Sequence, residues 1–205
     1  IGRTSEITIF ALPSETTNST FSAAAASVPV PPQPACTPEW LHHCGVFGEF
    51  WTPVDTSTHA KAKIEAELSA ALDFYMLEVD QRRWYGFWNW GDVMHYYDLV
   101  RNQWFYDLGG YAWDNSELQS DQWLWRSFLR TGRGDIFRLA EAMTRHVGEV
   151  DTYHIGQWAP LGTRHNVMHW GCPCKEPRVS QAPPKRFYYY LTADDRTGYL
   201  LNEVL

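Results

Sequence analysis

Two short segments of similar sequence, residues 128–132 and 189–193, each stand between two stretches with a helical pattern. The first reads Phe-Leu-Arg-Thr-Gly and the second Tyr-Tyr-Leu-Thr-Ala, so that Thr131 and Thr192 lie 61 positions apart. A period of this length is typical of stacked helical hairpins, and the short turns require the two helices of a hairpin to pack antiparallel. We therefore predict a mainly α fold, a partial α/α toroid of helical hairpins with long aromatic loops. A closed ring of this kind has about twelve helices, and the sequence predicts about five.

Apolar periodicity predicts where these helices lie. The first spans residues 59–81, with Ser57 or Thr58 as its cap. The next spans residues 115–130 and ends at Gly132. Asp135 is expected to cap a following helix that Gly148 closes. The apolar positions of the three helices are Ile64, Leu68, Leu72, Tyr75 and Val79, then Leu118, Trp125, Phe128 and Leu129, then Ile136, Leu139, Ala140, Met143 and Val147.

The remaining segments are less regular. Pro183 and Pro184 interrupt the helical pattern of residues 179–191, so either the helix begins at Pro184, where proline is tolerated, or the pattern is locally broken. A further helix is predicted over residues 194–205. Residues 84–110 are dense in aromatic residues and glycine and indicate a long ordered loop or short strands. Long ordered loops in compact domains are often functional.

The pattern predicts three consecutive parts. Residues 1–12 include an alternating stretch expected to be a strand at the end of a preceding β-domain. Residues 13–38 are rich in Pro, Ser and Ala and are predicted to be a linker. Residues 39–205 form the partial α/α-toroid domain. Because the chain begins with Ile1 and its first residues lack a signal-peptide profile, we expect it to begin inside a larger protein.

Composition excludes some classes of function. The net charge of −7 argues against nucleic-acid binding, which needs a basic face, and no apolar run approaches the roughly 20 residues of a membrane span. Eleven Trp, eleven Tyr and ten Phe either fill a core or offer faces on which sugar rings stack. Four cysteines and the sequon at Asn18 favour an extracellular, oxidising location. Cys36 and Cys44 could pair with each other or with Cys172 and Cys174; four cysteines allow three pairings, and the sequence does not choose among them.

The segment with the strongest chemical signal is residues 162–171, which brings together Arg164, His165, Asn166 and His169. A lyase acting on a uronate removes the proton beside the carboxylate and expels the glycosidic oxygen. Arg pairs bidentately with a carboxylate, and the unperturbed pKa of His suits a base near neutral pH. The alternative is that these side chains only satisfy the backbone of a buried loop.

Two further groups of residues are candidates. Asn89, Trp90, Asp92 and His95 form one, and Tyr111, Trp113, Asn115 and Glu117 form the other, with Tyr111 a reasonable acid for the leaving oxygen. Asp114 and Asn115 are alternatively ordinary helix caps. His165 and His169 followed by Cys172 and Cys174 have metal-ligand residue types, but their spacing matches no common zinc pattern, so we predict no metal site.

Several of these motifs together resemble the exo-rhamnogalacturonan lyase family. They are residues 88–95, 106–113, 128–133, 140–146 and 164–171, and the similarity spans roughly residues 85–205. The resemblance implies a catalytic α/α toroid flanked by two β-domains. It also implies β-elimination at galacturonate in rhamnogalacturonan I, with unsaturated products. The Pro-, Ser- and Ala-rich segment and the end of the chain at Leu205 depart from this pattern, so we expect an incomplete ring whose activity on its own is in doubt.

The residue roles rest on chemistry. We expect Arg164 and Asn115 to bind the uronate carboxylate, His165 or His169 to act as base and Tyr111 as acid. Substrate binding is assigned to Asn89, Trp90, Asp92, His95, Trp113, Glu117, Asn166 and Lys175. The expected partner is a pectic polysaccharide. No cofactor is expected, and calcium dependence stays open.

Two alternatives of other classes remain. A glycoside hydrolase on the same scaffold would need two carboxylates roughly 5–10 Å apart, and Asp92, Asp114 and Glu117 are available. A non-catalytic carbohydrate-binding fragment would use the same aromatic residues without turnover.

Overall fold

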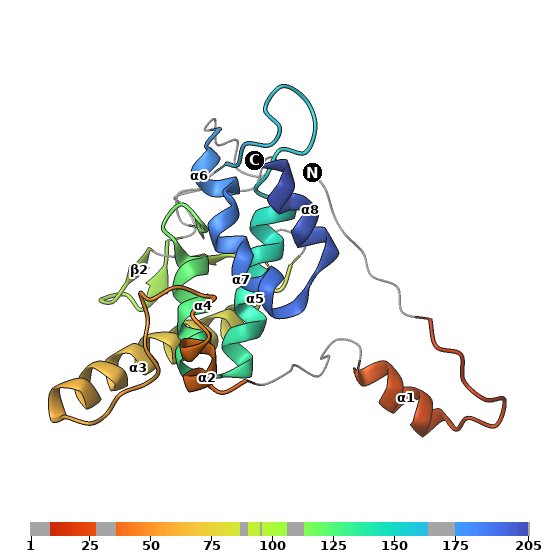
Figure 1. Ribbon diagram of the computed structural model, residues 1–205, viewed down its shortest axis with the longest axis horizontal. Coiled ribbons are helices and arrows are strands. Elements are labelled where there is room, and N and C mark those ends of the chain that lie inside the picture. Colours follow the sequence, from red (N-terminus) through yellow and green to blue (C-terminus); the bar gives the residue numbers. More distant parts are fainter. Residues whose placement is uncertain are drawn as a thin grey trace.

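The computed structural model describes residues 9–27, 36–86, 90–94, 96–105, 113–163 and 175–204. Over these residues the chain is mainly helical, as predicted (Figure 1). The described helices are α1 (Asn18–Ser27), α2 (Pro38–His43), α3 (His59–Arg82), α4 (Ser120–Thr131), α5 (Gly134–Glu149), α6 (Pro177–Ser180), α7 (Ala182–Thr192) and α8 (Asp195–Glu203). The described strands are β1 (Val93–Met94), β2 (Tyr97–Asp98), β3 (Gln103–Trp104) and β4 (Trp113–Asp114).

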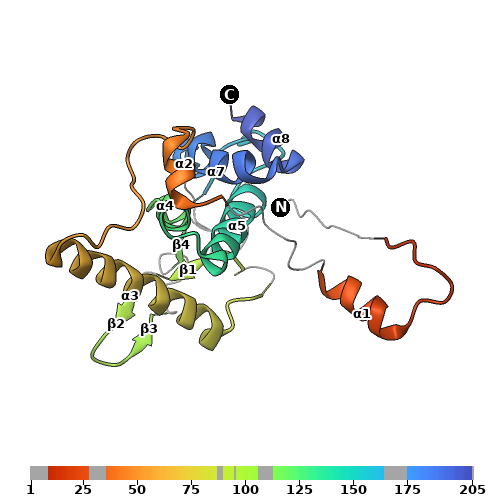
Figure 2. The same ribbon diagram turned by 60° about the horizontal axis from the view of Figure 1, so that its bottom comes forward.

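Two helical hairpins, α4–α5 and α7–α8, form the centre of the molecule, and their corners are built alike (Figure 2). The first helix of each ends in a left-handed residue, Gly132 with φ 69° and Ala193 with φ 54°. The hydroxyls of Thr131 and Thr192 both donate, at 2.7 Å, to the carbonyl four residues earlier. The predicted repeat is therefore confirmed at the level of individual hydrogen bonds.

Each corner threonine also fixes the exit of the chain. Its Oγ accepts from a backbone N–H two residues later, which is that of Arg133 in the first corner and that of Asp194 in the second, at 3.3 and 3.2 Å. The left-handed residue in turn donates its own N–H to the carbonyl four residues earlier at 2.7 Å in both cases. Because both ends of the turn are held in this way, the second helix returns antiparallel to the first.

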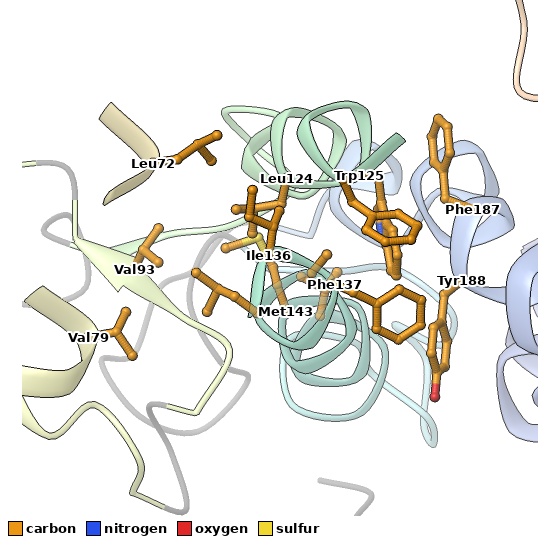
Figure 3. Packing of buried hydrophobic residues seen from close by; sticks show 14 of the residues in the cluster. Leu72, Val79, Val93, Leu124, Trp125, Ile136, Phe137, Met143, Phe187 and Tyr188 are labelled. Atoms are coloured by element: carbon orange, nitrogen blue, oxygen red, sulfur yellow. The ribbon is translucent and has the colours of Figure 1, made fainter. Parts of the chain in front are cut away.

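The core lies between these hairpins (Figure 3). Trp125 of α4 packs edge-on against Phe137 of α5 at 5.3 Å between ring centroids, and stacks on Tyr188 of α7 at 5.9 Å. On the other side, Val93 and Met94 of β1 bring the strand layer against the same core. Many of the aromatic residues, for which the sequence left open packing or sugar binding, therefore build the core.

Helix α3 lies beside strands β2 and β3 and packs against α5 (Figure 2). Its bounds confirm the predicted helix, and the Thr58 side chain accepts from the Lys61 N–H as the expected cap. Leu72 and Val79 are buried, whereas Ile64 and Leu68 of the predicted apolar stripe are exposed. Between α3 and α4 lies a groove of about 520 Å³.

Three boundaries in the hairpins differ from the prediction. Helix α4 begins at Ser120 rather than near Asn115, because Asn115 Oδ1 accepts the Glu117 N–H and holds residues 115–119 in turns. Leu118 consequently points to solvent, with 57% of its surface exposed. Asp135 lies inside the first turn of α5 rather than at its cap, and Gly148 lies inside that helix, which continues to Glu149.

The choice that the two prolines left open is resolved in favour of a helix start. Helix α7 begins at Ala182, so that Pro183 and Pro184 occupy the first turn, where no intrahelical N–H bond is lost. The predicted loop or short strands of residues 84–110 contain β1, β2 and β3 in their described part. Strands β1 and β4 pair antiparallel, as do β2 and β3.

The N-terminal part stands apart from the hairpins. Residues 9–12, the described end of the expected strand, are not in a strand, and α1 forms within the predicted linker, away from the rest of the molecule in both views (Figures 1 and 2). Cys36 and Cys44 are free thiols, and Cys172 and Cys174 lie outside the described residues. None of the described helices combines the length and the apolar character needed to cross a membrane.

Candidate functional site

The most unusual side chain of the core is His146, on the last turn of α5. Its side chain has no solvent-exposed surface, and Nδ1 lies 3.2 Å from the carbonyl oxygen of Trp90. Nε2 lies 3.4 Å from Asp92 Oδ2 and 3.4 Å from Asp151 Oδ1. These separations exceed the 2.7–3.2 Å of an ordinary N–H···O bond. An imidazole therefore sits between two buried carboxylates without a well-formed hydrogen bond to either.

Local sequence explains how the three side chains meet. Gly91 has φ 97°, and a Cβ there would lie 2.2 Å from the Ala142 carbonyl oxygen, so only glycine lets this segment run flat against α5. That close approach puts the Trp90 carbonyl and the Asp92 side chain beside His146. Asp151 follows the end of α5 directly, where its N–H donates to the His146 carbonyl at 3.2 Å.

Asn115 extends this network toward the next segment. Its Nδ2 donates to Asp151 Oδ2 at 2.8 Å and to the Thr163 carbonyl at 3.3 Å, while the Thr163 N–H donates to the Asp151 carbonyl at 2.7 Å. Both amide hydrogens of Asn115 are thus engaged. In this arrangement Asn115 holds Asp151 and the Thr163 carbonyl together, and its expected role as a donor to the substrate carboxylate stays a prediction.

Two more buried aspartates and a lysine surround the cluster. The Asp114 carboxylate accepts from the Ser120 hydroxyl, and Asp121 accepts from Ser116. Lys185 Nζ donates to the Ser180 carbonyl at 2.6 Å and to the Gln181 carbonyl at 3.1 Å. Neither Asp114 nor Asn115 is a helix cap, because Gln119 occupies that position in α4.

Burial and charge shift the pKa values of these groups. Burial raises the pKa of Asp92 to about 6, against the opposing charge of His146. Burial also raises the pKa of Asp114 to about 7 and lowers that of Lys185 to about 8. For His146, burial alone would lower the pKa, but the charges of Asp92 and Asp151 outweigh it and hold the pKa well above its ordinary value.

A cavity of about 200 Å³ borders His146 between α5 and α8. Cationic side chains line it, but they already have partners. Arg196 pairs with Glu149 at 2.6 Å, and Arg145 donates to the Tyr188 hydroxyl at 3.0 Å. A carboxylate ligand entering this cavity would therefore compete with ion pairs that the protein makes itself.

Other predicted site residues lie elsewhere. Trp113 is in the core, 5.5 Å from Trp84 between ring centroids, so its placement is that of a packing residue. Glu117 pairs with Arg178 at 2.8 Å, and Lys175 lies over the Tyr153 and Trp158 rings at 5.9 and 5.5 Å. Seven predicted residues fall outside the described residues: Asn89, His95, Tyr111, Arg164, His165, Asn166 and His169.

The three carboxylates expected for a hydrolase each have a different partner. Asp92 faces His146, Asp114 bonds Ser120, and Glu117 pairs with Arg178. None of the three lines the described cavity beside His146 or the groove between α3 and α4. The described structure gives no support to a pair of them as hydrolase acid and base.

Sequence reasoning missed His146, Asp151 and Lys185 as members of the site. His146 follows Met143 by three positions and precedes Val147, so it falls on the apolar stripe of α5. A titratable side chain on such a stripe was the available signal. Asp151 and Lys185 carried no comparable pattern.

Fold and site together define an α-helical hairpin domain with an aromatic core and a buried cluster of carboxylates around a histidine. Residues 31–205 match the family described as PcRGLX-like protein C-terminal alpha/alpha toroid domain. The chain belongs to this family, which is related to rhamnogalacturonan lyases. It is also 52% identical over 204 residues to the uncharacterized protein YetA of Bacillus subtilis (strain 168). That alignment covers 100% of this chain and 24% of YetA, so the chain spans about a quarter of the length of this relative.

Proposed function

We propose that this chain is part of a polysaccharide lyase that cleaves rhamnogalacturonan I at galacturonate by β-elimination. The family supports the class of activity. The observation within the chain that supports it best is the bridge made by Asn115, which joins the Asp151 carboxylate to the Thr163 carbonyl. Residues 113–115 and residue 163 are the described ends of the two segments that carry Tyr111 and Arg164.

In the proposed reaction a base removes the proton beside the uronate carboxylate, and the electron pair forms a carbon–carbon double bond. The bond to the glycosidic oxygen breaks, and that oxygen takes a proton from an acid. We assign the base to His165 or His169, the acid to Tyr111 and carboxylate binding to Arg164. An oriented donor of this kind contributes about 10²–10³ in rate. The elimination requires no redox or group-transfer cofactor.

We also propose that the hairpins α4–α5 and α7–α8 are consecutive units of an α/α toroid. The matching corners at Thr131 and Thr192 support this arrangement. The proposed substrate is a pectic polysaccharide or oligosaccharide, in line with the family. The proposed location is extracellular, in line with the sequon at Asn18.

The test follows the ultraviolet absorbance of the unsaturated uronate while the purified protein, at its full natural length, acts on rhamnogalacturonan I oligosaccharides. We expect a rise that disappears in Arg164→Ala and in His165→Ala if His165 is the base. Arg101→Ala is the matched control, since Arg101 is an exposed arginine paired with Asp98 beside β2. It should leave the rate unchanged.

The alternatives give different results in the same experiment. New reducing ends without a rise in absorbance would indicate a glycoside hydrolase. Saturable binding without either product would indicate a carbohydrate-binding protein. Loss of activity in Arg101→Ala as well would show that the effect of Arg164→Ala is not specific to the site.

A further inference from the structure

Six acidic side chains are buried in the described part of the chain, and only two buried side chains there are cationic. The acids are Glu78, Asp92, Asp114, Asp121, Glu149 and Asp151, and the cations are His146 and Lys185. Glu78 and Glu149 are paired with arginines near the surface, at 3.1 and 2.6 Å. Four aspartates remain for two cations. Asp114 and Asp121 each accept from a serine hydroxyl, whereas Asp92 and Asp151 share one imidazole. Since an uncompensated buried charge is costly, positive charge is shortest beside these two.

The shortage centres on one point. Asp92, His146 and Asp151 each offer one ligand atom, and the three atoms lie within 4.8 Å of one another. Among the described residues, His146 Nε2 and Asp151 Oδ1 have no hydrogen-bond partner, although both side chains are fully buried. Buried polar atoms are nearly always partnered. A cation bound at the point that both atoms face would satisfy them both.

The distances suit a metal ion. Zinc bonds to imidazole nitrogen and carboxylate oxygen are about 2.0–2.1 Å long, so two ligands of a tetrahedral ion stand about 3.3 Å apart. Nε2 is 3.4 Å from each of the two carboxylate oxygens. This separation is too long for a good N–H···O bond and matches the edge of such a tetrahedron.

The surroundings of the three side chains also match those of metal ligands. The Trp90 carbonyl, 3.2 Å from Nδ1, can accept a proton held on Nδ1, so a metal ion bound between the carboxylates would replace only the proton of Nε2. Asn115 Nδ2 holds the second oxygen of Asp151 at 2.8 Å. Partners of this kind orient metal ligands and fix their tautomers.

We propose that Asp92, His146 and Asp151 bind one first-row transition-metal ion, with Zn²⁺ as the best fit, and that this ion ties the segment before β1 to the end of α5. One nitrogen and two oxygen donors suit such a metal. They do not suit calcium, which takes 6–8 oxygen ligands. With a divalent cation present, the charges of the two carboxylates are balanced.

The experiment measures the metal content of the purified full-length protein and then titrates the metal-depleted protein with Zn²⁺ and with Co²⁺. We expect about one equivalent of metal, a tetrahedral Co²⁺ spectrum and a higher unfolding temperature on metal addition. Asp92→Asn should weaken binding about 10-fold or more while retaining the shape of the side chain. Asp121→Asn is the matched control, because Asp121 is equally buried but lies outside the ligand set. It should bind metal as the parent protein does.

Three results would overturn the site. The first is a protein that folds without metal and takes up none, which would leave a protonated His146 between the two carboxylates. The second is a sulfur-to-cobalt charge-transfer band, which would move the metal to the cysteines. The third is equal uptake by the Asp92→Asn and Asp121→Asn variants. The variants are compared only after circular dichroism shows that both are folded.

Discussion

His146 is held by Trp90 and Asp92 before β1 and by Asp151 after α5. This arrangement depends most directly on Gly91. The Gly91 backbone touches α5 so closely that a single added carbon would reach the Ala142 carbonyl. This contact brings the Trp90 carbonyl to Nδ1 and the Asp92 carboxylate to Nε2. The charge cluster is therefore a consequence of one glycine as much as of its charged members.

Gly91→Ala should accordingly destabilise the protein by more than about 2 kcal/mol, because the new methyl group clashes with backbone and the φ of 97° is unfavourable for alanine. Urea unfolding followed by circular dichroism measures the change. Gly134→Ala is the control. A Cβ at Gly134 meets nothing within 4 Å, and alanine is the better helix former at the start of α5, so this variant should gain about 0.5–1 kcal/mol. Equal effects of the two substitutions would contradict the close packing at Gly91.

Lys185 predicts how stability depends on pH. Burial lowers its pKa from 10.5 to about 8, so between these values the unfolded chain binds more protons than the folded one. The free energy of unfolding therefore rises with pH across this window. The stability gained from neutral Lys185 is fully present above pH 10.5 and is lost as the pH falls through about 8. The slope across this window is about 1.4 kcal/mol per pH unit.

The comparison is with Lys185→Met, measured by urea unfolding at several alkaline pH values. Other titrations are common to both proteins. The unfolding free energy of the parent protein should therefore increase relative to that of Lys185→Met as the pH rises. A difference that does not change with pH would show that Lys185 has an ordinary pKa in the folded protein.

At the level of elements, the two hairpin corners are the same structure with different residues at the left-handed position. Gly132 adopts φ 69° without strain, whereas Ala193 adopts φ 54° at some cost. Ala193→Gly should therefore stabilise the protein by up to about 1 kcal/mol, and Gly132→Ala should destabilise it by about 1 kcal/mol. A Cβ at Gly132 would touch only Pro38, at 3.8 Å, so no clash adds to this cost.

Thermal unfolding of both variants tests whether the corners are equivalent. The expected result is two changes of opposite sign and similar size. If Ala193→Gly is neutral or destabilising, the second corner does not behave as a counterpart of the first, whatever its hydrogen bonds.

The elements differ in how well the sequence predicts them. Helix α3, the ends of α4 and α7 and the repeat of the corners all follow from local rules: a cap, a left-handed residue and a periodic apolar stripe. The start of α4 does not, because the Asn115 side chain competes for the backbone and delays the helix to Ser120. Local signals therefore predict the start of α3 and the two hairpin corners, but they miss the start of α4 and the end of α5.

The site was predictable only in part, for a physical reason. Asp92 and Asn115 could be selected because they lie in motifs of unusual composition. Their partners could not, since Asp92 meets His146 through a backbone contact at Gly91, and Asn115 meets Thr163 across a separation of 48 residues. Contacts of this kind are determined by tertiary packing and leave little trace in local sequence.

For the whole molecule, stability and the candidate site reside in the same unit. Helix α5, which carries His146, packs against the aromatic core residues of α4 and α7. The N-terminal part contributes little to this core. No described side chain over residues 9–26 is buried, and Phe21 of α1 has 54% of its surface exposed. By contrast, α2 and the segment after it place Leu41, Phe47 and Trp51 in the core.

Removal of residues 1–30, which also precede the part matched by the family, should therefore change the free energy of unfolding by less than about 0.5 kcal/mol. Extending the deletion through residue 51 removes three buried side chains and should cost several kcal/mol, since each large apolar residue lost from a core costs about 2–5 kcal/mol. Urea unfolding of the two truncated proteins measures the contrast. If the shorter deletion is as destabilising as the longer one, the N-terminal segment packs on the hairpin domain in solution, and α1 belongs to the fold rather than to a linker.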